Sequence, residues 1–377
     1  MGRERVLAMD LLRGLAVAAM IGVHTVNALL DPALRQGVLS AVVHFASGLV
    51  APAFLLVAGF TFLLGNAPEG TGRRTFRSRL PRVLGRIGLI WLVGYLLHLP
   101  AYTLGDWRVR VGASGWQEFL GVDVLHCIGA SLLMLLVLRL VVPGGRALLG
   151  AVVLAGSLAV LLAGPVWQAE SVARLPLWLS GYLAPFGTTL FPLLPWFGFV
   201  AAGAVLSLLW TRTRAAGEEE RFQRALLRTG LALALPGLAL LVLVRDHLHL
   251  LVDERPAPLF FLCRLGFVLL FVAAGLRACR GRAVLAPLIA WPARESLLFY
   301  VLHLKLLYHP LPGGRSLVEL FGPHLGYPGC LAVAGALFLV TLVPAVLWHR
   351  LKSLHPLVGP RLVQAFLGLG LVVFLCY

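Results

Sequence analysis

Residues 38–64 read VLSAVVHFASGLVAPAFLLVAGFTFLL, a run of 27 residues without Asp, Glu, Lys or Arg. A helix of about 20 apolar residues crosses the hydrocarbon core of a bilayer, so this run predicts a transmembrane helix. Comparable apolar runs recur along the whole chain. We expect spans at residues 7–30, 38–64, 83–104, 119–142, 147–164, 189–210, 227–244, 258–276, 287–309, 328–349 and 362–377. The predicted fold class is therefore all-α: a polytopic integral membrane protein with about eleven transmembrane helices in one bundle.

The composition of the chain supports the same class. Its 377 residues are 59% hydrophobic and 13% charged, whereas soluble domains carry about 25% charged residues. The net charge of +16 comes mainly from arginines that lie in short loops between apolar runs and form no single stripe. We therefore expect contacts with membrane lipids and no nucleic-acid partner. The five cysteines show no CxxC or metal-ligand spacing, and we interpret them as packing thiols.

Basic residues are distributed unequally between the two sides of the predicted bundle. When the loops are assigned alternately to two sides, most of the basic residues lie on the side of the N-terminus. The run Arg73–Arg86 is among them. The positive-inside rule then places the N-terminus in the cytoplasm. The start of the chain resembles a signal peptide, but Asp10 and Arg13 interrupt its apolar run and no small-residue cleavage site follows. We interpret residues 7–30 as a retained first helix of a single transmembrane domain, 1–377, in a bacterial inner (plasma) membrane.

The first predicted span carries ionisable groups, which cost about 2.5–3.5 kcal/mol each inside a bilayer on insertion scales. These groups are Asp10, Arg13 and His24. Eleven helical residues turn through about 1100°, so Arg13 and His24 share one face, roughly 16 Å apart along the axis. Asn27 lies near the same stripe. We predict that this face lines a polar cavity; alternatively, His24 is only hydrogen-bonded to a neighbouring helix.

Other predicted spans contain histidines at central to outer membrane depth. They are His44, His98, His126 and His303. Asp123 precedes His126 by three residues, so the two share a helix face and the carboxylate can orient the imidazole. An interfacial position is an alternative explanation for His44 and His98. No HExxH or paired-carboxylate spacing is present, so we expect no metal site.

Five blocks of sequence carry a resemblance to a known family. They are RVLAMDLLRGLA at residues 5–16 with the following Met20–His24, APAFLLVAG at 51–59, VDVLHCIG at 122–129, FPLLPW at 191–196 and LLFYVLH at 297–303. In this order they resemble the heparan-α-glucosaminide N-acetyltransferase family and its bacterial transmembrane acyltransferase relatives. The resemblance is strongest over residues 3–310, and residues 311–377 add two further predicted helices. Because Asp-x-x-Arg-Gly followed by a histidine also opens the membrane O-acyltransferases, the order of the five blocks carries the resemblance.

The resemblance implies acyl transfer across a membrane, from cytosolic acetyl-CoA to an amino sugar or glycan on the outer side. A membrane-embedded histidine is expected at the centre, acting as a general base or as a transient acyl carrier. The catalytic candidates are His24, His303, His126, Asp123 and His44. Family members that modify heparan carry the proposed catalytic histidine in the loop after the first helix. Residues 25–43 contain no histidine, so His24 and His44, which bracket that loop, are both candidates for the central role.

Arginines on the predicted cytoplasmic side are candidates for binding the phosphates of acetyl-CoA, the expected acyl donor. The donor-binding candidates are Asp10, Arg13, Arg73, Arg74 and Arg77. Positive-inside topology alone also explains the arginine run. The candidates for acceptor binding are Asn27, Tyr300 and Trp196. For Trp196, the alternative is an interfacial tryptophan on a helix that starts at a proline.

A transporter or permease for a small polar solute is the main alternative function, and an inactive membrane scaffold is a third. Transporters often contain inverted repeats. No internal repeat is visible in this chain, which favours the enzyme. The expected partners are acyl-CoA, a glycan or amino-sugar acceptor and membrane lipids, and a homodimer is compatible with the sequence.

Overall fold

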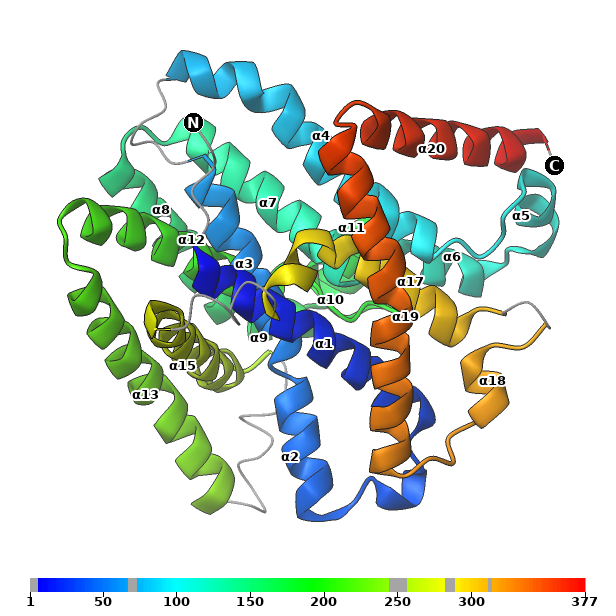
Figure 1. Cartoon of the computed structure of the whole chain (residues 1–377), viewed down its shortest axis with the longest axis horizontal. Coiled ribbons are helices and arrows are strands. Elements are labelled where there is room, and N and C mark those ends of the chain that lie inside the picture. Colours follow the sequence, from blue (N-terminus) through cyan, green and yellow to red (C-terminus); the bar gives the residue numbers. More distant parts are fainter. Residues whose placement is uncertain (1–5, 67–72, 244–255, 282–288, 311–313, 377) are drawn as a thin grey trace. The chain divides into compact units, whose positions relative to one another are not determined.

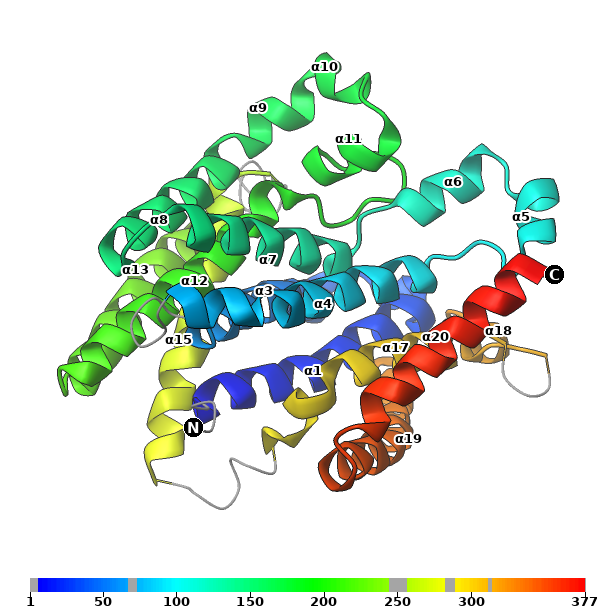
Figure 2. The same cartoon turned by 90° about the horizontal axis from the view of Figure 1, so that it is seen from above.

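The computed structural model describes residues 6–66, 73–243, 256–281, 289–310 and 314–376. Within these ranges every named element is a helix, apart from one isolated bridge between Leu30 and Leu325 (Figures 1 and 2). The longer helices are α1 (Leu7–Leu29), α3 (Val50–Leu64), α4 (Arg73–Leu97), α7 (Val124–Val141), α8 (Gly145–Leu161), α12 (Leu193–Ala215), α13 (Glu219–Leu243), α15 (Pro258–Gly281), α17 (Ser296–Tyr308), α19 (Tyr327–Leu354) and α20 (Val358–Cys376). The shorter helices are η1 (Pro32–Leu34), α2 (Gly37–Ser47), α5 (Leu104–Arg110), α6 (Ala113–Leu120), α9 (Ala163–Gln168), α10 (Glu170–Ala173), α11 (Leu177–Leu183), η2 (Trp291–Glu295) and α18 (Leu317–Phe321). The predicted all-α class is confirmed.

Among the described residues, seven helical segments are long and apolar enough to cross a membrane. They are Leu7–Leu29, Gly37–Leu64, Phe76–Leu97, Val124–Val141, Leu193–Ala215, Pro258–Cys279 and Tyr327–Leu354. Each coincides with a predicted span, so the chain is a polytopic membrane protein. The other four predicted spans fall on α8, α13, α17 and α20. With 17 and 13 residues, α8 and α17 are about 26 and 20 Å long, short of the ~30 Å hydrocarbon core. The count of eleven therefore remains a prediction.

The arginines predicted to lie in a loop before the third span are helical instead. α4 begins at Arg73, ahead of the expected start at residue 83, and continues through Pro81. That loop assignment was wrong because arginine is a good helix former. Hydropathy locates the apolar part of a helix and misses a polar extension of it. Arg77 and Arg86 are therefore displayed on a helix surface, where both side chains are exposed.

The helices form two compact units, of which the larger includes Ala51–Ala273. In this unit α12 packs against α7, α8 and α13, and α4 packs against α7 (Figure 2). Glycines allow the closest approach of α3 to α12. A Cβ on Gly59 would meet the carbonyl oxygen of Val200, and one on Gly203 would meet that of Leu56. Small residues at such crossings are typical of helices packed within a membrane.

The second unit comprises Arg5–Val50 and Ala274–Val373. Here α1 packs against η2 and α17 and is crossed by α19 (Figure 1). The Glu295 side chain, at the end of η2, is only 6% exposed. It accepts hydrogen bonds from His349 Nδ1 at 2.9 Å and from Lys352 Nζ at 2.7 Å, both on α19. These bonds to the buried Glu295 carboxylate tie η2 and the following α17 to α19, so they fix the helix that carries His303.

Candidate active site

Asp123 immediately precedes α7 and caps its N-terminus. Its Oδ1 accepts hydrogen bonds from the backbone N–H groups of Leu125 (2.8 Å) and His126 (3.2 Å), which would otherwise lack helical partners. The cap therefore holds the carboxylate against the first turn of the helix. His126 Nδ1 lies 3.0 Å from the same oxygen. The contact predicted from the three-residue spacing is confirmed.

The position of the hydrogen on His126 follows from its two neighbours. Asp123 Oδ1 at 3.0 Å requires a hydrogen on Nδ1, whereas the backbone N–H of Asp123 at 3.3 Å would require a lone pair there. The contact with the carboxylate is the shorter one, and charge-assisted hydrogen bonds are roughly twice as strong as neutral ones. We therefore assign the hydrogen to Nδ1 and the lone pair to Nε2. His126 Nε2 is buried and has no hydrogen-bond partner among the described residues, so its lone pair is available to accept a proton.

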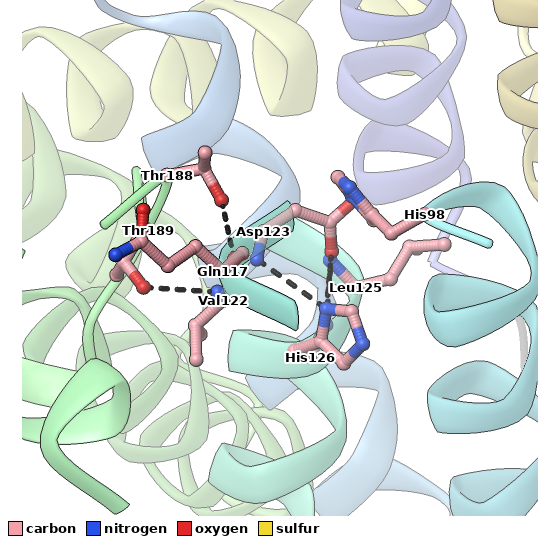
Figure 3. Close-up of polar contacts among 8 residues, drawn as sticks. All are labelled: His98, Gln117, Val122, Asp123, Leu125, His126, Thr188 and Thr189. Atoms are coloured by element: carbon pink, nitrogen blue, oxygen red, sulfur yellow. Dashed lines mark hydrogen bonds and ion pairs between the residues drawn. The ribbon is translucent and has the colours of Figure 1, made fainter. Parts of the chain in front are cut away.

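A second imidazole approaches the same carboxylate from the end of α4. His98 Nε2 lies 3.3 Å from Asp123 Oδ2, so the two carboxylate oxygens face different histidines (Figure 3). Burial alone would raise the pKa of the Asp123 carboxyl. Hydrogen bonds with His126 and His98 outweigh burial and hold this pKa below its usual range. Asp123 is therefore an anion at neutral pH.

The segment that carries Asp123 is anchored by the segment before α12. The backbone N–H of Val122 donates to Thr189 Oγ1 at 3.1 Å, and Thr188 Oγ1 donates to the Gln117 carbonyl at 2.9 Å (Figure 3). The Val122 carbonyl accepts from the backbone N–H of Phe191 at 3.1 Å. The two bonds of Val122 satisfy buried backbone groups of the non-helical segment before α7. They position the cap of α7 independently of the histidines.

The wall beside His126 is formed by α4. A Cβ on Gly94 would lie 3.0 Å from both Cε1 and Nε2 of His126, so the ring fits only against a residue without a side chain. The Tyr95 ring stands edge-on to the imidazole, with ring centroids 4.3 Å apart. One turn earlier, Trp91 packs over Gly129 and donates its Nε1–H to the Tyr182 hydroxyl at 3.1 Å. His126 thus lies in a buried aromatic pocket.

The second unit holds another histidine cluster, between α1 and α17. The ring centroids of His24 and His303 are 5.1 Å apart. His303 Nδ1 lies 2.7 Å from the carbonyl oxygen of Phe299. A carbonyl only accepts, so Nδ1 carries the hydrogen. His303 Nε2 then has the lone pair, and this buried atom has no hydrogen-bond partner in the described part of the chain. Tyr300 lies 5.8 Å from His303, and Tyr308 lies 6.4 Å from His24, between ring centroids.

The remaining candidates on the first two helices differ in exposure. Asp10 and Arg13 are half-buried in the first two turns of α1. Asn27, in the last turn of the same helix, is exposed. His44 is exposed on α2, whereas its competitor His24 is half-buried and contacts His303.

The candidates on α4 and α12 also separate into surface and core. Arg77 is exposed, and the side chains of Arg73 and Arg74 lie outside the described part of the structure. Trp196 is 2% exposed and packs in an aromatic core, with its ring centroid 4.7 Å from that of Phe191. The proline-started helix is present, and its tryptophan is buried among other aromatic rings.

The contact of His98 with Asp123 was not predicted, because the sequence interpretation allowed His98 an interfacial position. Residues 98 and 123 lie on different elements, and no spacing rule relates them. The only sequence signal is the three-residue spacing of Tyr95 and His98, which places two polar-tipped rings on one face at the end of the helix. Tyr182 and Tyr308 had no comparable signal.

Over the described residues there is no set of three or more His, Cys, Asp or Glu side chains arranged to hold a metal ion. The two histidine clusters supply imidazole, carboxylate and phenol groups.

Comparison with known families places this arrangement in context. The family model described as heparan-alpha-glucosaminide N-acetyltransferase, catalytic, matches residues 5–242. This is well over half of the chain, and it includes His24, His98 and the Asp123–His126 pair, whereas the block LLFYVLH at 297–303 lies beyond it. No curated protein matches the chain. The chain belongs to the heparan-alpha-glucosaminide N-acetyltransferase catalytic family, and this membership points to a transmembrane acetyltransferase.

Proposed function

We propose that this protein moves an acetyl group from cytosolic acetyl-CoA to an amino sugar or another glycan on the outer side of the membrane. The family match supports acetyl transfer. The observation that carries the proposal for this chain is the buried Nε2 lone pair of His126, in a ring whose Nδ1 faces an anionic carboxylate. Proton-coupled transporters also use buried histidines and carboxylates, so the family match is what favours acetyl transfer over transport.

The proposed reaction uses His126 as the general base. Its Nε2 takes a proton from the acceptor amine while the nitrogen attacks the thioester carbonyl carbon. The C–S bond then breaks, and the imidazolium returns the proton to the departing CoA sulfur. Asp123 stabilises the imidazolium between these steps through the 3.0 Å contact with Nδ1. Atoms and charge balance: amine and acetyl-CoA give amide and CoA thiol.

His24 is the second proposed participant, as the central histidine of the other cluster. Its imidazole lies beside the buried His303, and a neutral imidazole can accept the acyl group itself. In that case acyl-His24 forms as the C–S bond breaks and CoA leaves as the thiolate. The acceptor nitrogen then displaces the imidazole, and the proton lost by the amine goes to the CoA thiolate, so that amide, neutral His24 and CoA thiol result. Tyr300 and Asn27 are proposed to contact the acceptor. His44 stays the competing candidate for the central role.

The donor is proposed to bind through arginines. Arg13, with Asp10 one turn before it, is half-buried in α1, and Arg77 is exposed on α4. Arginine recognises phosphate through paired, charge-assisted hydrogen bonds, which suits the phosphates of CoA. Arg73 and Arg74 remain proposed on sequence grounds.

Acetyl transfer by purified protein in proteoliposomes tests the proposal. Radiolabelled acetyl-CoA is supplied on one side and a panel of amino sugars on the other, and both CoA release and labelled product are measured. We expect product to accumulate on the side opposite the donor, and empty liposomes to give none. Solute uptake without acetyl transfer or CoA release would instead identify a transporter. Absence of both activities would identify a scaffold.

A further inference from the structure

His98 has a specific relation to the proposed base. Its Nε2 lies 3.3 Å from Asp123 Oδ2, while His126 Nδ1 lies 3.0 Å from Oδ1. Oδ1 also accepts two backbone N–H groups of the helix cap. His98 therefore holds the opposite oxygen and restrains rotation of the carboxylate away from His126.

α4 sets the position of His98. The residue directly follows α4, and its backbone N–H donates to the Tyr95 carbonyl at 3.2 Å. The same helix supplies Gly94 and Tyr95, which pack against the His126 ring. α4 thus provides both the wall of the His126 pocket and His98, the second histidine that contacts Asp123.

The two imidazoles differ in exposure. His126 is buried, with its side chain 1% exposed, whereas the His98 side chain is 29% exposed. Their ring centroids are 5.9 Å apart, and both rings contact the Asp123 carboxylate. His98 can therefore be replaced with less disturbance of the core than His126.

We infer that His98 is a positioning residue for His126, acting through Asp123. This inference rests on the proposed function in its assignment of His126 as the base. It has two separable consequences. Loss of the hydrogen-bond donor at position 98 should release the carboxylate, and a replacement that keeps a donor there should hold it in place.

Three substitutions separate these consequences. His98→Ala removes the donor, and we expect kcat to fall about ten-fold with little change in KM, as expected for a misplaced catalytic group. His98→Leu fills similar space without a donor and should lose kcat to the same extent. His98→Gln keeps an N–H donor, so kcat should stay near the wild-type value.

The control is His324→Gln, which removes an exposed histidine outside both clusters and should change neither quantity. Thermal unfolding of each variant establishes that it is folded. A role for His98 in packing alone predicts wild-type kcat in His98→Leu. That result, or wild-type kcat in a folded His98→Ala protein, would overturn the inference.

A measurement without turnover separates this inference from the proposed function. In full-length protein with isotope-labelled histidine, the ring-nitrogen NMR signals of His126 should change in His98→Ala and His98→Leu, and stay unchanged in His98→Gln and His324→Gln. If this dependence is present but the wild-type protein transfers no acetyl group, the proposed function fails and the positioning role stands. If acetyl transfer occurs and the dependence is absent, the inference about His98 fails alone.

Discussion

The two histidine clusters differ in the group that fixes the buried imidazole. In the larger unit, His126 Nδ1 faces the anionic Asp123, whereas in the second unit His303 Nδ1 faces the carbonyl of Phe299. Both arrangements leave a buried Nε2 lone pair. A carboxylate stabilises an imidazolium by its full charge, but a carbonyl mainly selects the tautomer. The first cluster is therefore suited to taking a proton, and the second to presenting a neutral imidazole.

The second histidine of each cluster extends this contrast. His98 lies on the far side of a carboxylate from His126, whereas His24 is next to His303 with ring centroids 5.1 Å apart. The carbonyl that fixes His303 carries only a partial charge, so it offsets a positive charge on this pair poorly. We therefore expect proton transfer at His126 and acyl-group chemistry, or hydrogen bonding to the acetyl carbonyl, at His24. This division of roles can be tested by substitution.

The largest effect is expected for His24→Ala. If His24 is central, turnover should fall below detection while donor binding and thermal stability are retained, because the side chain is only half-buried. Acetyl transfer and acetyl-CoA titration of the purified variant measure this. His44→Ala tests the competing assignment. Full activity in His24→Ala together with its loss in His44→Ala would move the central role to His44.

Next in size is the effect of Asp123→Asn. Asparagine is as good an N-cap as aspartate, so the fold should be spared while the negative charge beside His126 is lost. General base catalysis contributes about 10²- to 10⁴-fold, and we expect kcat to fall by about 10²-fold or more. The matched control is Asp31→Asn, which replaces the capping carboxylate of η1. Equal losses in the two variants would contradict a specific role for Asp123. They would also contradict the division of roles between His126 and His24.

A smaller effect is expected on the donor side. Removal of one charge-assisted hydrogen bond to a phosphate should cost about 1.5–3 kcal/mol of binding free energy. Arg13→Gln, and separately Arg77→Gln, should therefore weaken acetyl-CoA binding by about ten-fold or more without changing thermal stability. Isothermal titration gives the affinities, with Arg221→Gln as control because Arg221 is exposed and pairs with Glu218 at 3.3 Å. Unchanged affinity in both variants would leave these arginines as topology and packing residues.

The smallest effect concerns the pocket wall. Gly94→Ala places a methyl group 3.0 Å from His126 Cε1 and Nε2, so the ring must shift by a few tenths of an ångström. We expect kcat to fall several-fold, by about three- to ten-fold, because the base is misplaced. Gly88→Ala on the same helix meets nothing within 4 Å and should be neutral or stabilising. Equal activity of these two variants would show that the fit of Gly94 against His126 is not required.

Local features of the site could be predicted from the sequence. The three-residue spacing of Asp123 and His126 predicted their contact, although the two do not share a helix face as expected, because Asp123 is the extended N-cap that precedes α7. The apolar runs predict the membrane class, and seven of them coincide with helices long enough to span. The predicted loop before residue 83 was wrong because hydropathy does not detect the polar start of a helix.

Contacts between helices could not be predicted in the same way. His98 meets Asp123, and His24 meets His303, across large separations in the chain. In a soluble protein the apolar face of a helix shows which side is buried. In a membrane, the lipid-facing side is as apolar as the packed side, so periodicity does not indicate which face meets a neighbour. For the same reason the sequence could not show that Trp196 is a core residue.

The sequence by itself therefore determined the all-α membrane class, the family and the pairing of Asp123 with His126, since apolar length and helical spacing are local properties. Only the tertiary structure showed that His98 contacts Asp123 and that His24 lies beside His303. Only it showed that α4 provides both Gly94 and His98 to the pocket of His126. Those contacts depend on how α4 packs against α7 and how α1 packs against α17. Helix packing is set by close fit at glycines and by buried polar partners, which single-helix periodicity does not encode.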